Sequence, residues 1–234
     1  MVDSMNVYIY PNEPADDGLA RDAAEALDAA TNQTMDYFSN NGENIGRSIN
    51  IRDDYPEVVT DESGPPGPER TYIQKKDEII KDFRLWRRDN NRQQTGVHLL
   101  VTDIPDGEGG GLSTGYFGGA WRNPPNAIAT KTSEQSISNF KNLCIHECYH
   151  LFINIGSVVV GAGGARADHV LGEVLSDGPD AGKITPMLNG YYDQGFAAKG
   201  ECDNTGGKNG YSMTLSDCAL EKTLKSYREQ GNLF

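Results

Sequence analysis

The stretch at residues 143–151 reads LCIHECYHL and contains the pattern His-Glu-x-x-His at His146, Glu147 and His150. Apolar residues around it recur at helical spacing, so we expect a partly buried helix here. Residues four apart lie on one face of a helix, so both imidazoles can reach a single ion while the carboxylate stands beside them. Two nitrogen ligands, an open position and a carboxylate base predict a hydrolytic Zn²⁺ site, with Glu147 as the catalytic base.

The composition limits the partners of the chain. Its 234 residues are enough to bury a proper core, and the formal net charge is −13. This charge argues against nucleic acid or an anionic membrane as a partner, because both attract basic surfaces. The sequence has no apolar run long enough to span a bilayer. Acidic residues spread along the chain favour a protein kept soluble in high salt, and an ordinary acidic protein is the alternative.

Strand-like and helix-like stretches alternate before the histidine motif. We expect strands at residues 7–10, 48–52, 97–102 and 126–130, and amphipathic helices at residues 18–38 and 72–88. This order predicts an α+β fold: a mixed twisted sheet with backing helices and an active-site helix, followed by a smaller irregular lobe. We place the N-terminal lobe at residues 1–155 and the C-terminal lobe at residues 156–234. His98, within an expected strand, is interpreted as a structural histidine.

A glycine-rich passage, GEGGGLSTGYFGG at residues 107–119, separates two of these strands. It lacks the Gly-Lys-Ser/Thr ending of a phosphate-binding loop. We therefore interpret it as a strand at the sheet edge beside the active-site cleft, where unpaired backbone groups can hold an extended peptide. A surface loop is the alternative. The residues that we expect to form this edge are Gly111, Leu112, Ser113, Thr114 and Gly115.

Candidates for the third metal ligand follow the motif in RADHVLGEVLSD, residues 166–177. His169 and Glu173 are four apart, so both can point the same way if the segment is helical. Asp168 is a weaker candidate.

The strand and helix order, followed by His-Glu-x-x-His, resembles the metzincin-type zinc peptidases, a branch of the zincins. The later YSMTLSDC, residues 211–218, looks like the corresponding segment of the adamalysin or reprolysin branch. The resemblance implies a zincin-like fold with His169 as the third zinc ligand and Met187 in the methionine turn beneath the metal. Met213 is a second methionine candidate. The metzincin spacing is extended here, since 18 residues separate His150 from His169.

A thermolysin-like arrangement is the rival interpretation. GEVLSD, residues 172–177, is similar to the Asn-Glu-x-x-Ser-Asp pattern of those enzymes, which would make Glu173 the third ligand. Either arrangement implies a zinc-dependent metalloendopeptidase that acts on a peptide or protein through an activated water. Two other functions stay open: a catalytically degenerate zincin that acts as a binding protein, and a hydrolase of non-peptide amides.

The cysteines bear on localisation. Cys202 and Cys218 lie in a loop-rich region and could pair, whereas Cys144 and Cys148 are four apart on the expected helix, a geometry unsuited to a disulfide. At least one disulfide is expected, which indicates a secreted, extracellular protein. Its N-terminus has neither the basic nor the apolar region of a signal peptide, so the signal or pro-segment would be absent from this sequence.

Overall fold

The computed structural model describes residues 4–58, 72–103, 110–114, 119–121, 123–154, 171–188 and 208–231. The helices within these ranges are α1 (Asp17–Asn40), α2 (Tyr72–Asp89), α3 (Ile137–Phe152) and α4 (Asp217–Gly231). The strands are β1 (Ser4–Pro11), β2 (Gly46–Ile51), β3 (Val97–Asp103), β4 (Gly110–Thr114), β5 (Asn126–Lys131), β6 (Lys183–Ile184) and β7 (Gly210–Tyr211). Each helix and strand expected before the histidine motif is present within a few residues of its expected bounds.

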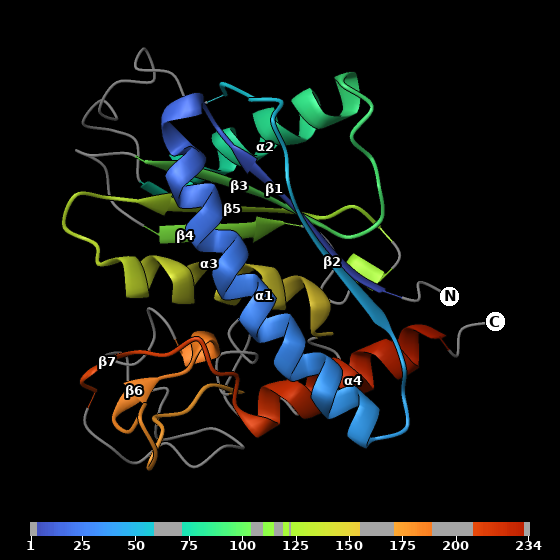
Figure 1. The fold of residues 1–234 in the computed structure, drawn as a ribbon. Coiled ribbons are helices and arrows are strands. Elements are labelled where there is room, and N and C mark those ends of the chain that lie inside the picture. The colour runs from blue at the N-terminus through green and yellow to red at the C-terminus, as the bar shows by residue number, and fades with distance from the viewer. Residues whose placement is uncertain are drawn as a thin grey trace.

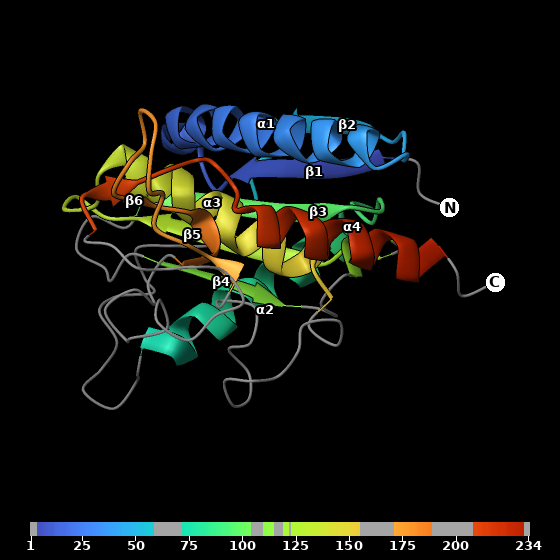
Figure 2. The ribbon, with the colours of Figure 1, turned by 90° about the horizontal axis from the view of Figure 1, so that it is seen from below.

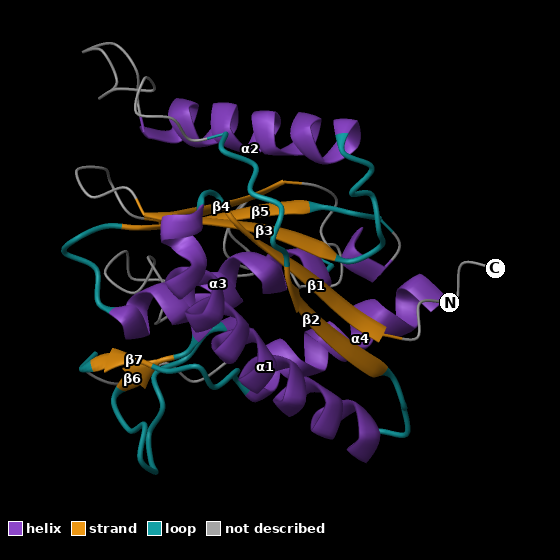
Figure 3. Cartoon of the chain, turned by 45° about the horizontal axis from the view of Figure 1, so that its top comes forward, coloured by secondary structure: helices purple, strands orange, loops and turns teal. Residues whose placement is uncertain are grey.

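The five longer strands form one mixed sheet in the order β2-β1-β3-β5-β4. The first four run parallel, and β4 pairs antiparallel with β5. Helices cover both faces: α1 and α3 lie on one side of the sheet and α2 on the other (Figures 1 and 3). The expected α+β architecture, a mixed sheet backed by helices, is therefore confirmed.

The main core lies between the sheet and the helices α1, α3 and α4. Side chains alternate along β1, so that Val7 and Ile9 join this core while Tyr10 joins a smaller cluster beneath α2. Helix α4 packs against both α1 and α3, although it is far from α1 in the sequence (Figure 2). None of the helices among the described residues is long and apolar enough to cross a membrane.

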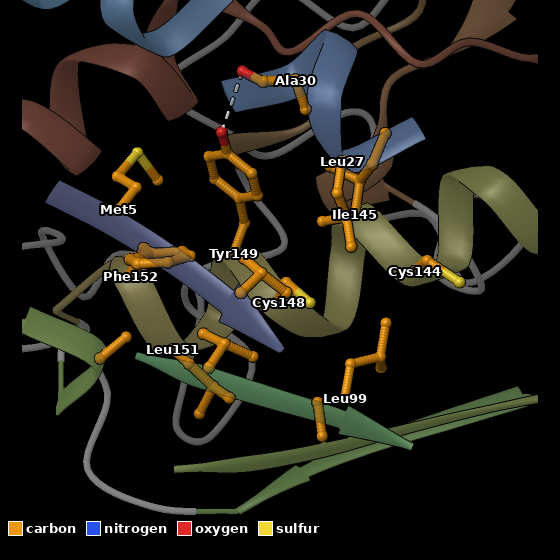
Figure 4. Close-up of a cluster of buried hydrophobic side chains, with 14 of the residues drawn as sticks. Met5, Leu27, Ala30, Leu99, Cys144, Ile145, Cys148, Tyr149, Leu151 and Phe152 are labelled. Atoms are coloured by element: carbon orange, nitrogen blue, oxygen red, sulfur yellow. Dashed lines mark hydrogen bonds between the residues drawn. The ribbon is translucent and has the colours of Figure 1, made fainter. Parts of the chain in front are cut away.

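Helix α3 runs through the middle of this core, so most of its side chains are buried. Tyr149 points from α3 to α1, where its hydroxyl donates to the carbonyl of Ala30 at 3.0 Å (Figure 4). Cys144 and Cys148 also lie in the core as free thiols, and burial raises the pKa of both. Ile137 is the exception to the expected apolar stripe, since it is 41% exposed in the first turn.

The structure bears on the predicted disulfide but not on the predicted boundary between the two lobes. Cys218 is disulfide-bonded, and the free state of Cys144 and Cys148 excludes a bridge from α3 to the C-terminal segment. Cys202 lies outside the described residues. The proposed lobe boundary at residue 155 also falls outside them and stays a prediction. Beyond it, the described residues form the short pair β6 and β7, a short 3₁₀ helix at Pro186–Leu188 and helix α4.

His98 is a satisfied structural histidine, as expected. It is completely buried in β3, and its Nε2 donates to the carbonyl of Gln94 at 2.8 Å. Its Nδ1 therefore accepts from the hydroxyl of Tyr10 at 3.0 Å. Burial, helped by the nearby positive charge of Arg87, lowers the pKa of His98 to about 3, so the ring is neutral.

Asp16 is the N-cap residue of α1, but its side chain makes no capping hydrogen bond. The carboxyl instead accepts from the backbone N–H of Asp103 at 2.9 Å, which ties the start of α1 to the end of β3. Burial, with a smaller contribution from the charge of Glu13, raises the pKa of Asp16 to about 6. Ionised Asp16 therefore destabilises the folded protein.

We predict that Asp16→Asn removes a pH-dependent loss of stability. Between pH 4 and 6 the unfolded chain releases this proton more readily than the folded one, so the wild type loses stability as pH rises. The free energy of unfolding of the variant relative to wild type should rise across this window by up to about 3 kcal/mol and stay level above pH 7. Urea unfolding at pH 4, 6 and 7.5 measures it. The exposed Asp82→Asn is the control, and equal pH profiles for wild type and Asp16→Asn would refute the assignment.

Candidate metal centre

The second half of α3 carries the three residues of the histidine motif. The N-cap residue of this helix is Ser136, whose Oγ accepts from the backbone N–H of Asn139 at 3.2 Å. His146, Glu147 and His150 lie two to four turns further on and are only 3%, 6% and 7% exposed. Polar groups buried this deeply require partners, because losing water without replacement is costly.

The two histidines meet at their Nε2 atoms, which are 2.9 Å apart. Their ring centroids are 4.3 Å apart and the ring planes cross at 81°, so the two imidazoles meet edge to face and their Nε2 atoms lie within hydrogen-bonding distance of each other. The four-residue spacing on α3 brings about this meeting, as the sequence predicts. Two imidazole nitrogens directed at a common point are a donor set suited to Zn²⁺.

The hydrogen bond at Nδ1 of His146 determines the tautomer of the ring, and so the state of the Nε2 atom that faces His150. Its Nδ1 lies 2.7 Å from the carbonyl oxygen of Pro186. A carbonyl can only accept, so Nδ1 carries the hydrogen and donates it. In the neutral ring this leaves a lone pair on Nε2, the atom directed at His150. A backbone carbonyl that holds the far nitrogen of a histidine is a common support for a metal ligand.

Pro186 belongs to a short 3₁₀ helix, η6 (Pro186–Leu188), which passes beneath α3. The next residue, Met187, is 1% exposed and packs in the same core cluster as the apolar residues of α3. The sequence proposes Met187 as the residue beneath the metal, and the structure places it one residue from the carbonyl that holds His146. Met213, the second candidate, is only partly buried at the margin of this cluster.

Asn142 joins α3 to the chain around η6. Its Nδ2 donates to the carbonyl of Ser212 at 2.6 Å and to that of Ile184 at 3.3 Å. Ile184 lies two residues before Pro186, so this side chain anchors the segment that holds His146. Asn142 is not among the residues predicted for the site, although a polar Asn one turn before His146 within an apolar helix is a signal that could have identified it.

Glu147 is packed against the edge strand β4. A Cβ atom built on Gly111 would lie 2.6 Å from Cδ of Glu147, closer than atoms that are not bonded to each other can approach. Residue 111 therefore has to lack a side chain for the carboxyl of Glu147 to occupy its position. The glycine-rich edge and the catalytic candidate, which are separated in the sequence, thus come into direct contact.

The pairing of β4 with β5 determines which backbone groups remain at the edge of the sheet. The N–H of His98 donates to the carbonyl of Pro125, so the odd-numbered residues of β5 direct their backbone groups toward β3. The even-numbered residues then bond to β4, in pairs such as Ile128 with Leu112. By alternation, Gly111 and Ser113 direct their N–H and C=O groups away from β5. Among the described strands none pairs with this side of β4.

The other residues predicted for the site, on the edge strand and as third metal ligands, lie in several places. Leu112 turns to the opposite face of the sheet, where it packs against the cluster beneath α2. Glu173 is half-buried, and its backbone pairs with that of Thr185 at 2.9 Å. His169, Asp168 and Gly115 lie outside the described residues. Within the described residues no three His, Cys, Asp or Glu side chains gather into a group that could hold a metal ion. The third ligand, His169 or Glu173, therefore stays a prediction.

No family model matches the sequence, and no curated protein matches it. Among solved structures, the chain is similar to the crystal structure of metalloproteinase-II from Bacteroides fragilis, with a TM-score of 0.43 and 13% sequence identity. The match covers 96% of this chain and 53% of that one, so the chain spans about half the length of that protein. A likeness this distant carries no argument about function, which has to rest on the geometry of the site.

Proposed function

We propose that the protein is a zinc-dependent metalloendopeptidase. The observation that carries this proposal is the convergence of the His146 and His150 Nε2 atoms, 2.9 Å apart, on the same helix as a carboxylate packed against an open sheet edge. His146 and His150 would hold the metal, with His169 as the third ligand. Bound zinc would supply Lewis acidity, which polarises the substrate carbonyl and lowers the pKa of a water molecule.

Glu147 performs the proton transfer in this proposal. Its carboxylate takes a proton from the attacking water and passes it to the nitrogen of the leaving amine, as a general base and then a general acid. The side chain is 6% exposed and held in place by the close approach of Gly111, so few water molecules compete for its oxygens. A carboxylate fixed in this way loses little conformational entropy when it acts.

The substrate would be a peptide or protein chain bound as an additional strand on β4. The outward N–H and C=O groups of Gly111 and Ser113 can pair with an extended backbone. Gly111 also contacts Glu147, so a chain paired there has a peptide bond next to the proposed base. This open edge favours peptides over the small amides that a non-peptide hydrolase would accept. We also propose that the protein acts outside the cell, where the disulfide at Cys218 would persist.

We predict that the purified protein contains about one zinc per chain and cleaves casein. Glu147→Gln should keep the metal and lose activity by at least about a hundredfold, because it removes the proton acceptor but no ligand. His169→Ala should lose the metal. Metal content by atomic absorption, together with casein cleavage, measures both.

Glu173→Ala is the matched control and should keep both the metal and the activity. If Glu173→Ala loses the zinc while His169→Ala retains it, the third ligand is the glutamate of the thermolysin-like arrangement. If the wild type binds zinc but cleaves no peptide, the protein is a binding protein or acts on another amide. If it binds no zinc, the proposal is wrong.

Gly111→Ala tests the contact between the edge strand and the base. The added methyl group has to displace the carboxyl of Glu147, so activity should fall by on the order of tenfold to a hundredfold, the cost expected for a catalytic group moved by about 1 Å. Zinc content should not change, because the variant alters neither histidine. Ser113→Ala, two residues along the same strand, is the control and should retain activity. Wild-type activity in Gly111→Ala would contradict the proposed role of Glu147.

A further inference from the structure

Lys76 reaches the open edge of the sheet from the opposite side to the metal centre. It lies near the start of α2, and its Nζ donates to the carbonyl of Gly111 at 3.0 Å. That carbonyl is one of the groups that β4 directs away from β5, according to the pairing described above. The ammonium of Lys76, from α2, therefore lies at Gly111, the residue that also lies against Glu147.

A peptide that pairs with β4 needs the position that Lys76 occupies. Strand addition uses the outward carbonyl of Gly111 as an acceptor for a backbone N–H of the peptide. The ammonium has to move off that carbonyl when the peptide binds, yet it stays close because α2 is fixed to the sheet through Ile80 and Phe83. The displaced cation then lies beside the bound peptide.

The alternation of side chains determines which peptide residues meet this cation. The side chain of Leu112 points to the α2 face of the sheet, whereas residue 111 faces Glu147. In an added strand the residue opposite Gly111 likewise faces Glu147, and its two neighbours face α2. A carboxylate on either neighbour could pair with the ammonium of Lys76, a contact in which both groups are charged and which is stronger than a bond to a neutral carbonyl.

We propose that Lys76 is a specificity-determining residue that selects peptides with Asp or Glu within two positions of the scissile bond. This inference rests on the proposed peptidase function. The chain carries a net charge of −13, so an acidic peptide is repelled by the protein as a whole and depends on a local cation at the binding site. The ammonium of Lys76 supplies that cation at the strand that would hold the peptide.

Paired peptides that differ only by Asp or Asn next to the cleaved bond test the proposal. The wild type should have the higher kcat/KM for the Asp peptide, and Lys76→Met should reduce this ratio by on the order of tenfold, as expected for one charge-assisted hydrogen bond. Lys76→Arg should keep the preference. Lys76→Glu should reverse it in favour of a Lys-containing peptide, a result that a purely structural role would not produce.

Lys81→Met is the matched control, because Lys81 is an exposed lysine on the same helix. It should leave the preference unchanged. An Asp-to-Asn ratio that is equal in wild type, Lys76→Met and Lys76→Glu would overturn the proposal.

Binding of the same peptides, followed by fluorescence anisotropy, separates this inference from the proposed function. Suppose that the wild type hydrolyses neither peptide but binds the Asp peptide more tightly than the Asn peptide, and that Lys76→Met loses this difference. Lys76 then selects acidic peptides, and the proposal that the protein hydrolyses peptides is wrong. If both peptides bind equally to wild type and Lys76→Met, the selection by Lys76 is wrong, whatever the result for hydrolysis.

Discussion

The candidate site depends on two histidines and a glutamate being buried in the middle of the core helix α3. Polar side chains in such a position destabilise a protein unless each finds a partner. His146 donates to the carbonyl of Pro186, His150 meets His146, and Glu147 lies against the backbone of Gly111. These contacts bring together the helix, the segment at η6 and the edge strand β4, which are far apart in the sequence. The segment at η6 thus supports His146 through the carbonyl of Pro186.

The sheet edge contributes a second constraint, the absence of a side chain at residue 111. Gly111 lies on β4 at a place where an added Cβ atom would collide with Glu147 of α3. The antiparallel pairing with β5 directs its backbone groups to the sheet edge, where its carbonyl accepts from Lys76. One residue thus provides room for the base and a docking point for an extended chain. The same alternation carries Leu112 to the other face, from which Lys76 extends.

The sequence predicted the elements of the N-terminal part because their signals are local. Alternating or helical periodicity is a property of a few consecutive residues, and so is the four-residue spacing of His146 and His150. The carbonyl of Pro186, the anchor Asn142 and the approach of Gly111 to Glu147 depend on the packing of distant segments, and no local pattern encodes them. Asp16 shows the same limit: aspartate directly before a helix is typical of a cap, but a tertiary contact directs its carboxyl to the backbone N–H of Asp103.

The proposed metal centre needs a third ligand. His169 was inferred from a resemblance and lies outside the described residues, whereas Glu173 lies within them at the start of the segment that leads to Pro186. The spacing in the sequence does not decide which of them is the third ligand, because His169 and Glu173 are only four residues apart in one short segment. The two Nε2 atoms, 2.9 Å apart, mark the place where we propose that the metal binds.

Anomalous diffraction at the zinc absorption edge, from crystals of the protein grown with zinc, shows whether the metal binds at His146 and His150. We expect one strong anomalous peak in contact with the Nε2 atoms of both His146 and His150. An anomalous peak at another position would contradict the proposed site. So would a hydrogen bond between the two histidines that persists at saturating zinc.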